Sequence, residues 1–273
     1  MFPVLARFGP FGIFGHQVGP FTLHTYGMLV ALGFVAALIV VMRGARREGL
    51  PSEPVLDLAF VAVLAAIVGS RLLYVLFNIQ EYLADPLRIF KVWEGGLVFH
   101  GGLLLAIPAC LFFVRRFSLP AWATADVFAP AIALGQAIGR IGCFAAGCCY
   151  GAPWEPPFCV TFTDPDALAP LHVPLFPSQL LAFGSGIIVF MVLVAYRPRR
   201  RATGQVFWLY LILASAARLA EDAFRGTDAK LAILPWMSAT QAISLGLAAF
   251  ALLMFVAFGR RSPGRSGRLT LPR

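Results

Sequence analysis

Gly139-Arg140-Ile141-Gly142-Cys143-Phe144-Ala145-Ala146-Gly147-Cys148-Cys149-Tyr150-Gly151 ends a long apolar segment and places one arginine within it. A charged side chain inside a membrane-spanning segment is costly, and it usually faces the interior of a helix bundle at a functional site. The nearest acidic residue earlier in this segment is Asp126, several turns away. The glycines around Arg140, and the Gly135-x-x-x-Gly139 spacing before it, are typical of close helix packing. We therefore expect Arg140 to meet an anion from elsewhere in the chain or from a ligand.

The composition predicts an integral membrane protein. Apolar residues make up 59% of the 273 residues and charged residues only 13%, about half the share in a typical soluble domain. The formal net charge of +9 could indicate nucleic-acid binding. The basic residues, however, lie in short loops between apolar segments, which favours a positive-inside membrane topology. We expect no nucleic-acid partner.

Seven apolar segments have roughly the length that a helix needs to cross a bilayer. They are 22–42, 55–78, 97–114, 122–147, 177–196, 204–225 and 233–258. Fourteen of the 22 Lys and Arg residues lie in loops on one side of these segments, and five lie on the other. Because cytoplasmic loops carry the positive excess, the N-terminus is predicted outside and the C-terminus inside. The predicted fold class is an all-α integral membrane protein with seven transmembrane helices.

Three segments outside the spans have recognisable character. Residues 79–96 mix aromatic and charged side chains, as expected of an arm lying in the membrane interface. Residues 150–176 are proline-rich and acidic, and we expect a small periplasmic cap there. Residues 259–273 form a basic tail, predicted to be cytoplasmic and disordered. No internal repeat is visible, so residues 1–258 are predicted to form one membrane domain.

The polar residues within the predicted spans gather toward the outer leaflet. This placement predicts an outward-facing, hydrated and net-cationic cavity that opens to lipid. The residues concerned are Tyr26, Arg71, His100, Arg140, Ser178, Gln179, Arg218, Glu221 and Asp222.

Five of these residues also have a purely structural interpretation. Arg71 could extend to the outer headgroups while its stem stays in the bilayer. Arg218 and Asp222 are four residues apart on one helix face, so they could form a structural ion pair. Tyr26 could belong to the aromatic belt at the membrane interface. His100 could be an ordinary buried histidine. Arg140 is the hardest of the five to explain without a ligand.

The five cysteines do not have the spacing of a zinc site. Cys143, Cys148 and Cys149, with Cys159 nearby, lack the paired spacing and the histidine partner of such sites. Cys148, Cys149 and Cys159 are expected at the outer face, where one disulfide could persist in an oxidising compartment. Cys143 lies one turn beyond the buried arginine and has no adjacent base, so we do not expect a nucleophile. Cys110 is expected to fill space within its span.

The ordered set of motifs resembles the prolipoprotein diacylglyceryl transferases, a family of bacterial membrane enzymes. The resemblance covers nearly the whole chain. It is carried by Thr25-Tyr26-Gly27-Met28, Ser70-Arg71-Leu72-Leu73-Tyr74, Phe99-His100-Gly101-Gly102, Gly139-Arg140-Ile141-Gly142, Pro177-Ser178-Gln179-Leu180, Arg218 with Asp222-Ala223-Phe224-Arg225, and Ser238-x-x-Gln241-x-x-Ser244. Two positions depart from the family pattern, with Cys143 in place of an asparagine and Cys148 in place of a glutamate.

The resemblance implies a reaction. Members of the family move the diacylglyceryl group of phosphatidylglycerol to the lipobox cysteine of a prolipoprotein and release glycerol phosphate. It implies that Arg140 and Arg218 bind the phosphodiester as planar forks and that His100 accepts the thiol proton. The other implied substrate-binding residues are Tyr26, Arg71, Gly101, Gly102, Cys143, Gly151, Ser178, Gln179 and Asp222.

The resemblance also implies the setting of the reaction. The protein is expected in the bacterial inner membrane as a monomer, with membrane lipids around it and its site toward the periplasm. No metal or other cofactor is expected. Two other classes of function stay open from the sequence: a transporter of an anionic solute, which usually shows internal repeats, and a relative that binds anionic lipid without transferring it.

Overall fold

The computed structural model describes residues 2–9, 11–13, 16–18, 21–91, 95–225, 232–234 and 237–261. These residues divide into two compact units. The first unit contains the described residues of 1–40 and 125–267, and the second contains 41–124. Residues 259–261 of the predicted disordered tail are helical instead. The rest of that tail, from 262 onward, and residues 92–94 of the predicted arm lie outside the described residues.

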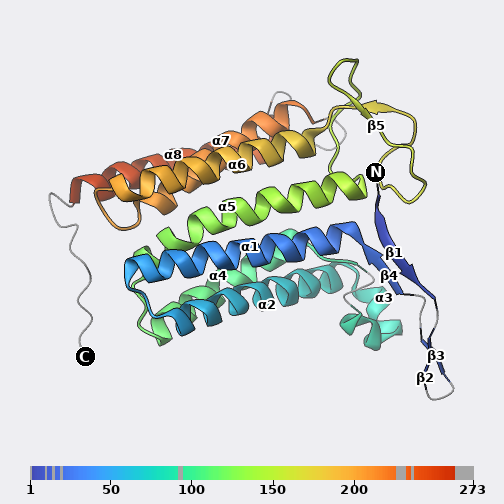
Figure 1. Ribbon diagram of the computed structural model, residues 1–273, viewed down its shortest axis with the longest axis horizontal. Coiled ribbons are helices and arrows are strands. Elements are labelled where there is room, and N and C mark those ends of the chain that lie inside the picture. Colours follow the sequence, from blue (N-terminus) through green and yellow to red (C-terminus); the bar gives the residue numbers. More distant parts are fainter. Residues whose placement is uncertain are drawn as a thin grey trace. The chain divides into compact units, whose positions relative to one another are not determined.

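Long helices account for most of the described chain (Figure 1). They are α1 (Thr25–Glu48), α2 (Ser52–Phe77), α4 (Phe99–Arg116), α5 (Ala121–Ala146), α6 (Ser178–Tyr196), α7 (Gln205–Ala223) and α8 (Ala239–Arg261). Within the described residues, six of them are long and apolar enough to cross a membrane. Helix α7 is not among the six, and it carries three charged residues, Arg218, Glu221 and Asp222, near its end. The protein is therefore a mostly helical, multi-pass membrane protein.

The first helix begins three residues later than predicted, because the chain before it is extended. Strand β1 (Val4–Phe8) pairs antiparallel with β4 (Phe21–His24), and β2 (Phe11–Ile13) pairs with β3 (His16–Val18). In β4, apolar residues alternate with polar ones, which is a strand pattern rather than a helical one. Residues 22–24 alone are too few to distinguish a strand from the first turn of a helix. A third short pair, β7 (Ala232–Leu234) with β8 (Met237–Ser238), precedes α8.

The surfaces of the long helices are apolar. Leu104 and Leu253 are each 70% exposed and Phe112 is 72% exposed. Apolar surface on this scale is unfavourable in water, because each exposed side chain of this kind forgoes roughly 1.5–3 kcal/mol. Hydrocarbon around the helices removes that cost. The exposed apolar residues therefore agree with a membrane location.

Helices α5, α6 and α7 form the core of the first unit (Figure 1). Small side chains on α5 allow the three helices to approach closely, and α8 packs against α7. The buried residues of this core are Ala129, Ala133, Val189, Leu193, Val206 and Tyr210.

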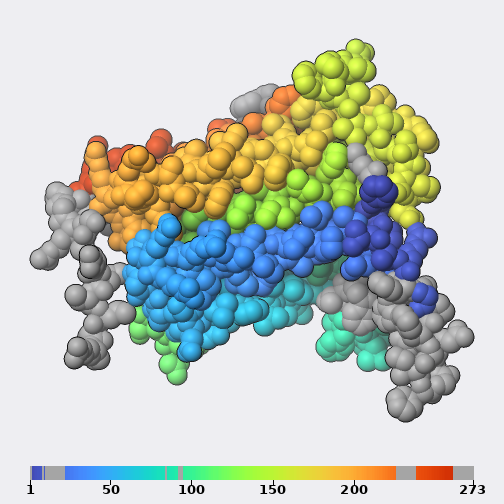
Figure 2. Space-filling model, in the orientation of Figure 1, coloured from blue at the N-terminus to red at the C-terminus, as the bar shows by residue number. Residues whose placement is uncertain are grey.

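The segment after α5 projects beyond the ends of α5 and α6 and is drawn in yellow-green (Figures 1 and 2). It contains the two-residue strands β5 (Val160–Thr161) and β6 (Pro174–Leu175), which pair antiparallel. Phe162 and Leu175 are each 2% exposed and form its small core with Ala169. Asp166 of this segment forms an ion pair with Arg7 of β1.

A buried carboxylate holds the start of α7. Asp126 is fully buried and accepts backbone N–H groups of Gly204 at 2.7 Å and Phe207 at 2.9 Å. It also forms an ion pair with Arg200 at 3.3 Å. The residue that precedes α7 is Gly204, which has no side chain to satisfy the free N–H groups of the first turn. Asp126 performs that capping role from α5.

We predict that Asp126→Ala destabilises the protein by about 3–5 kcal/mol, because it leaves Arg200 without its carboxylate and the first turn of α7 uncapped. The thermal unfolding midpoint of the purified protein in detergent measures this loss. Asp57→Ala removes an exposed carboxylate on α2 and should leave the midpoint nearly unchanged. Equal midpoints for the two variants would contradict the capping role.

Candidate functional site

Two arginines from different helices meet at one carboxylate oxygen in the first unit. Glu221 Oε2 lies 3.4 Å from Arg218 Nη1 and 3.8 Å from Arg140 Nη2. The Arg140 and Arg218 side chains are 29% and 28% exposed, whereas that of Glu221 is 10% exposed. The hydroxyl of Ser185 donates to the other Glu221 oxygen at 3.4 Å. Glu221 therefore positions both guanidinium groups while leaving part of each accessible.

A third guanidinium makes the site net positive. Arg225, just after α7, interacts electrostatically with Arg218, Arg140 and Glu221. Its Nε is buried and has no hydrogen-bond partner among the described residues. The second carboxylate, Asp222, is 2% exposed and accepts the hydroxyl of Ser238 at 2.9 Å. Three cations face two carboxylates, so the site favours a bound anion.

The predicted ion pair between Arg218 and Asp222 is replaced by one between Arg218 and Glu221. Residues three and four apart both lie next to each other on a helix surface, so spacing alone does not select the partner. Asp222 instead accepts a hydrogen bond from Ser238, which lies in β8 directly before α8. Of the two carboxylates on α7, Glu221 is the one that contacts Arg218 directly.

Tyr26 lies against the glycine that follows Arg140. A Cβ added at Gly142 would lie 3.2 Å from Tyr26 Cδ2 and 3.3 Å from its carbonyl oxygen. Any larger residue at 142 would push α1 away from the arginine site. Two turns earlier, Gly135 packs against Gly33 in the same way, because a Cβ added at Gly33 would lie only 3.0 Å from Gly135 O. The expected helix packing of the Gly135-x-x-x-Gly139 pair is confirmed at Gly135, whereas a Cβ added at Gly139 would meet no atom of the described residues within 4 Å.

The end of α5 is closed by a Schellman turn. The N–H of Gly147 donates to the carbonyl of Phe144 at 3.2 Å, and the N–H of Cys148 donates to that of Cys143 at 3.1 Å. This pattern needs a residue in the left-handed region after the helix, and Gly147 supplies it with φ +75°. The turn brings the residue two positions beyond the helix back over its last turn. The turn therefore places Cys148 next to Cys143.

Ser178 and Gln179, at the start of α6, hold the chain that follows this turn. Gln179 Nε2 donates to the carbonyl of Cys148 at 2.8 Å, and the Ser178 hydroxyl donates to that of Cys149 at 2.7 Å. Both side chains are buried. Gly151 continues the chain against α6 and α7, and a Cβ there would lie 2.8 Å from the carbonyl oxygen of Phe224. These contacts fix the position of the cysteine-containing loop.

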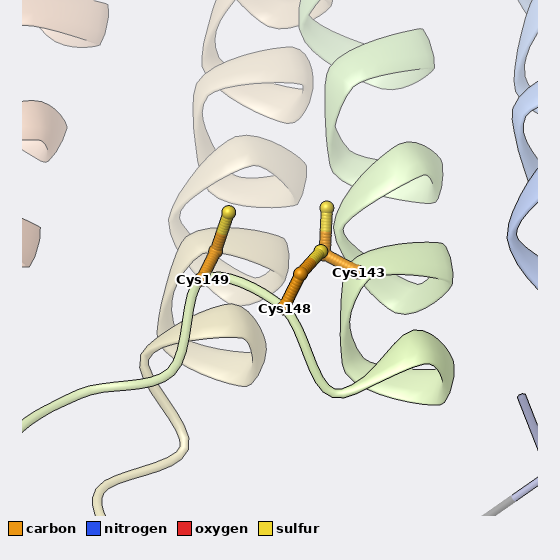
Figure 3. Close-up of side chains that lie close together, drawn as sticks. All are labelled: Cys143, Cys148 and Cys149. Atoms are coloured by element: carbon orange, nitrogen blue, oxygen red, sulfur yellow. The ribbon is translucent and has the colours of Figure 1, made fainter. Parts of the chain in front are cut away.

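Three thiols converge where this loop returns to α5 (Figure 3). The sulfur atoms of Cys143, Cys148 and Cys149 all lie within 4.8 Å of one another. All five cysteines, including Cys159, are free thiols, so the expected outer-face disulfide is absent from the described residues. The cluster instead joins two of the outer-face cysteines to Cys143 of α5.

The three thiols and the nearby arginines influence one another electrostatically. Hydrogen bonds with Cys143 and Cys148 lower the pKa of the Cys149 thiol against the effect of burial, and the positive charges of Arg140 and Arg225 lower it further. The hydrogen bond with Cys143 raises the pKa of Cys148. Negative charge in the cluster is therefore favoured at Cys149, which is also its exposed member.

His100, Gly101 and Gly102 begin α4 in the second unit. A Cβ at Gly101 would lie 2.3 Å from Gly69 O, and one at Gly102 would lie 2.5 Å from Ser70 Oγ. The two buried glycines therefore allow α4 to cross α2 at backbone contact. His100 precedes them, is exposed, and contacts the ring of Phe99 edge to face at 5.8 Å.

Arg71 is buried in the second unit and uses all five of its N–H donors. It is 5% exposed and lies beside the rings of Tyr74 and Tyr82. Its acceptors are the carbonyl oxygens of Arg88, Ile89, Lys91, Gly95 and Gly96, at 2.5–3.2 Å. These residues lie in and after the short helix η1 (Pro86–Phe90), which follows the short helix α3 (Ile79–Ala84). Arg71 thus organises the predicted arm and has no donor left for a headgroup.

We predict that Arg71→Ala loosens the arm, because five charge-assisted hydrogen bonds to its backbone are lost. Amide hydrogen exchange within residues 79–91 should become at least about tenfold faster, while transfer activity falls less than it does without Arg140. Arg115→Ala, which removes an exposed guanidinium at the end of α4, is the matched control. Unchanged exchange in the arm would show that Arg71 does not hold it.

The sequence missed two parts of this site. Arg225 follows a glutamate, an aspartate and two apolar residues, and only the end of α7 turns it back toward Arg140 and Arg218. The Cys143, Cys148 and Cys149 cluster had a usable signal, because a glycine directly after a helix is typical of a Schellman turn. That turn predicts contact between residues 143 and 148. The sequence spacings typical of zinc ligands do not take such a turn into account.

Comparison with known proteins gives a consistent result. A family model described as prolipoprotein diacylglyceryl transferase matches residues 14–257. The chain is 36% identical over 253 residues to the phosphatidylglycerol–prolipoprotein diacylglyceryl transferase of Geobacter sulfurreducens, covering 91% of this chain and 95% of the relative. It is 35% identical over 267 residues to the protein of the same name from Proteus mirabilis, covering 90% and 91%. The corresponding protein of Bordetella bronchiseptica is 36% identical over 264 residues, covering 91% and 95%.

Proposed function

This chain belongs to the prolipoprotein diacylglyceryl transferase family, and on that basis we propose that it transfers the diacylglyceryl group of phosphatidylglycerol to a prolipoprotein. The acceptor is the thiol of the lipobox cysteine, and glycerol phosphate is the leaving group. The observation that supports this most strongly is the pair Arg140 and Arg218 on one oxygen of Glu221, with Arg225 beside them. A single phosphodiester supplies the negative charge that this cluster lacks.

Arg140 and Arg218 act together in the proposed reaction. The bond between the glyceryl carbon and its phosphate oxygen breaks as the bond between that carbon and the thiol sulfur forms. Negative charge then grows on the phosphate, and Arg140 and Arg218 stabilise it through charge-assisted hydrogen bonds. Glu221 keeps the two guanidinium groups oriented before the lipid binds. Tyr26, beside Gly142, provides a hydroxyl for the headgroup.

The proton of the incoming thiol needs an acceptor, and we assign that role to His100. Its imidazole is exposed at the start of α4, and imidazole can accept a proton near neutral pH. This assignment rests on the chemistry of the side chain and on its motif. Ser178, Gln179 and Gly151 contribute by holding the loop of the cysteine cluster, whereas Gly101 and Gly102 contribute by allowing α4 to approach α2.

We further propose that all seven long helices cross the membrane, with the N-terminus outside. Positive loop charges support this orientation, and α7 can span because its charged residues pair with other side chains rather than with lipid. The segment 150–176 then forms a periplasmic cap, and the arginine site opens toward the periplasmic side of the bacterial inner membrane. Cysteine substitutions labelled with a reagent that cannot cross membranes should react at Asp164 from outside and not at Arg46 or Arg116.

The function is tested by incubating the purified full-length protein with phosphatidylglycerol and a lipobox peptide. We expect a peptide whose mass has increased by one diacylglyceryl group, linked through a thioether. A peptide with serine in place of the lipobox cysteine is the acceptor control, and phosphatidylethanolamine is the donor control. Absence of the thioether product with folded protein and both substrates would contradict the proposal.

A further inference from the structure

We propose that Cys143, Cys148 and Cys149 form a three-thiolate binding site for Zn²⁺, with a fourth coordination position left open for a thiol. The inference starts from the convergence of their sulfur atoms, all within 4.8 Å of one another (Figure 3). Three protein ligands with one open position is the arrangement of catalytic zinc sites, whereas structural zinc sites use four.

The geometry needs only a small contraction to hold the ion. Zn–S bonds are about 2.3 Å long, so two sulfurs at tetrahedral angles lie about 3.8 Å apart. Sulfur atoms within 4.8 Å reach that separation by side-chain rotation and sub-ångström shifts of the loop. Cys143 is fixed on α5, and the Schellman turn at Gly147 fixes Cys148 over it.

The loop that carries Cys148 and Cys149 is anchored by hydrogen bonds from α6. Gln179 and Ser178 donate to the carbonyls of Cys148 and Cys149, so the backbone of both ligand residues is anchored to α6. Buried residues that orient ligands in this way are a usual feature of metal sites. Cys149 adopts φ +59°, an uncommon conformation for a residue other than glycine. This backbone conformation sets the direction in which its side chain leaves the loop.

The surrounding charge favours an occupied site. Three thiolates and one Zn²⁺ carry a net charge of −1, and isolated negative charge is unfavourable near a membrane. Arg140 and Arg225 both act electrostatically on Cys149. The positive charges of these two arginines therefore offset part of the negative charge of the zinc-thiolate group. The two sites lie in the same unit, with Cys143 one turn beyond Arg140.

The open position gives the ion a function that rests on the proposed transferase activity. Cys149 is the exposed cysteine of the cluster, so the fourth position is reached from its side. A thiol bound to Zn²⁺ loses its proton, since a coordinating thiol is deprotonated outright, and His100, the proton acceptor assigned above, would take that proton up. The lipobox thiolate would bind there beside the phosphodiester held by Arg140. Its sulfur then bonds to the glyceryl carbon, the carbon–oxygen bond to phosphate breaks, and glycerol phosphate leaves with the electron pair.

The test loads the reduced full-length protein with Co²⁺, which replaces Zn²⁺ and reports sulfur ligands by a charge-transfer absorption. We expect one Co²⁺ per chain, displaced by Zn²⁺. Cys148→Ser should lower the Co²⁺ affinity by about 10²-fold or more, since losing even a residue that only orients a metal ligand costs about 10–100-fold. Cys148→His should retain the ion with a changed spectrum, which separates loss of a ligand from misfolding. Cys159→Ser and Cys110→Ser are matched controls and should bind as the wild type does.

The open position is tested with lipobox peptide and no lipid. The peptide should change the Co²⁺ spectrum, and the same peptide with serine in place of cysteine should not. Failure to bind one Co²⁺, or equal loss of binding in Cys159→Ser, would overturn the site. Binding without a response to the peptide would overturn the open position. Removal of zinc by a chelator should slow transfer, and unchanged transfer would reject the zinc role while leaving the proposed function intact.

Discussion

Arg140→Ala should reduce transfer of the diacylglyceryl group by at least about 10³-fold, because it removes a planar donor pair aimed at the charge that develops on phosphate. The loss should appear in kcat more than in KM, since the interaction strengthens as the phosphate leaves. The measurement is the rate of thioether formation on a lipobox peptide. Thermal unfolding of the same preparation verifies that the variant is folded.

Arg140→Lys should recover little of this loss. An ammonium is a point charge and cannot replace two parallel N–H bonds to one phosphate. Arg199→Ala is the matched control, because it removes an exposed guanidinium just after α6. Turnover near that of the wild type in folded Arg140→Ala would return this arginine to a purely structural role as a partner of Glu221.

His100→Ala should slow transfer by about 10²–10⁴-fold, the usual contribution of a general base. Imidazole added to the buffer should restore part of the rate, because the exposed position at the start of α4 leaves space for it. His24→Ala, which removes an exposed imidazole from β4, should keep the wild-type rate. A His100→Ala protein that transfers normally, or one whose rate imidazole does not change, would rule out the proton-acceptor role.

The parts of the fold that depend on the burial of apolar residues could be predicted from the sequence. A long apolar segment has one low-cost state in a membrane, a helix. Each predicted span corresponds to a helix within a few residues, apart from a longer C-terminal end of α1 and a start of α8 that lies six residues later than predicted. The strands before α1 could not be predicted in the same way. Their short alternating segments contain too few residues to distinguish a strand from the start of a helix.

In the arginine site, too, some features could be predicted from the sequence and others depend on tertiary packing. Arg140 was recognisable because a charge within an apolar segment requires an explanation. Its carboxylate partner was not, because Glu221 lies far along the chain and only the packing of α5 against α7 brings it close. Arg71 illustrates the opposite case. Its sequence context is equally apolar, yet the chain itself supplies five carbonyl acceptors for it.

Ser178 and Gln179 make contacts that their sequence motif did not predict. Both were expected to contact substrate, and both donate their hydrogen bonds to the loop of the cysteine cluster. A motif that is typical of an enzyme family can therefore act without contacting the substrate, by positioning the residues that do. Sequence patterns reveal that such residues matter without indicating which atoms they contact.

The most direct test of the transferase assignment follows both products of one reaction in water enriched in ¹⁸O. Wild-type protein, phosphatidylglycerol and lipobox peptide are mixed, and the thioether peptide and glycerol phosphate are quantified together by mass. We expect equal amounts of the two products and no ¹⁸O in glycerol phosphate, because the thiol sulfur attacks carbon and the phosphate keeps its oxygens. Glycerol phosphate that carries ¹⁸O, or that forms without thioether peptide, would contradict it.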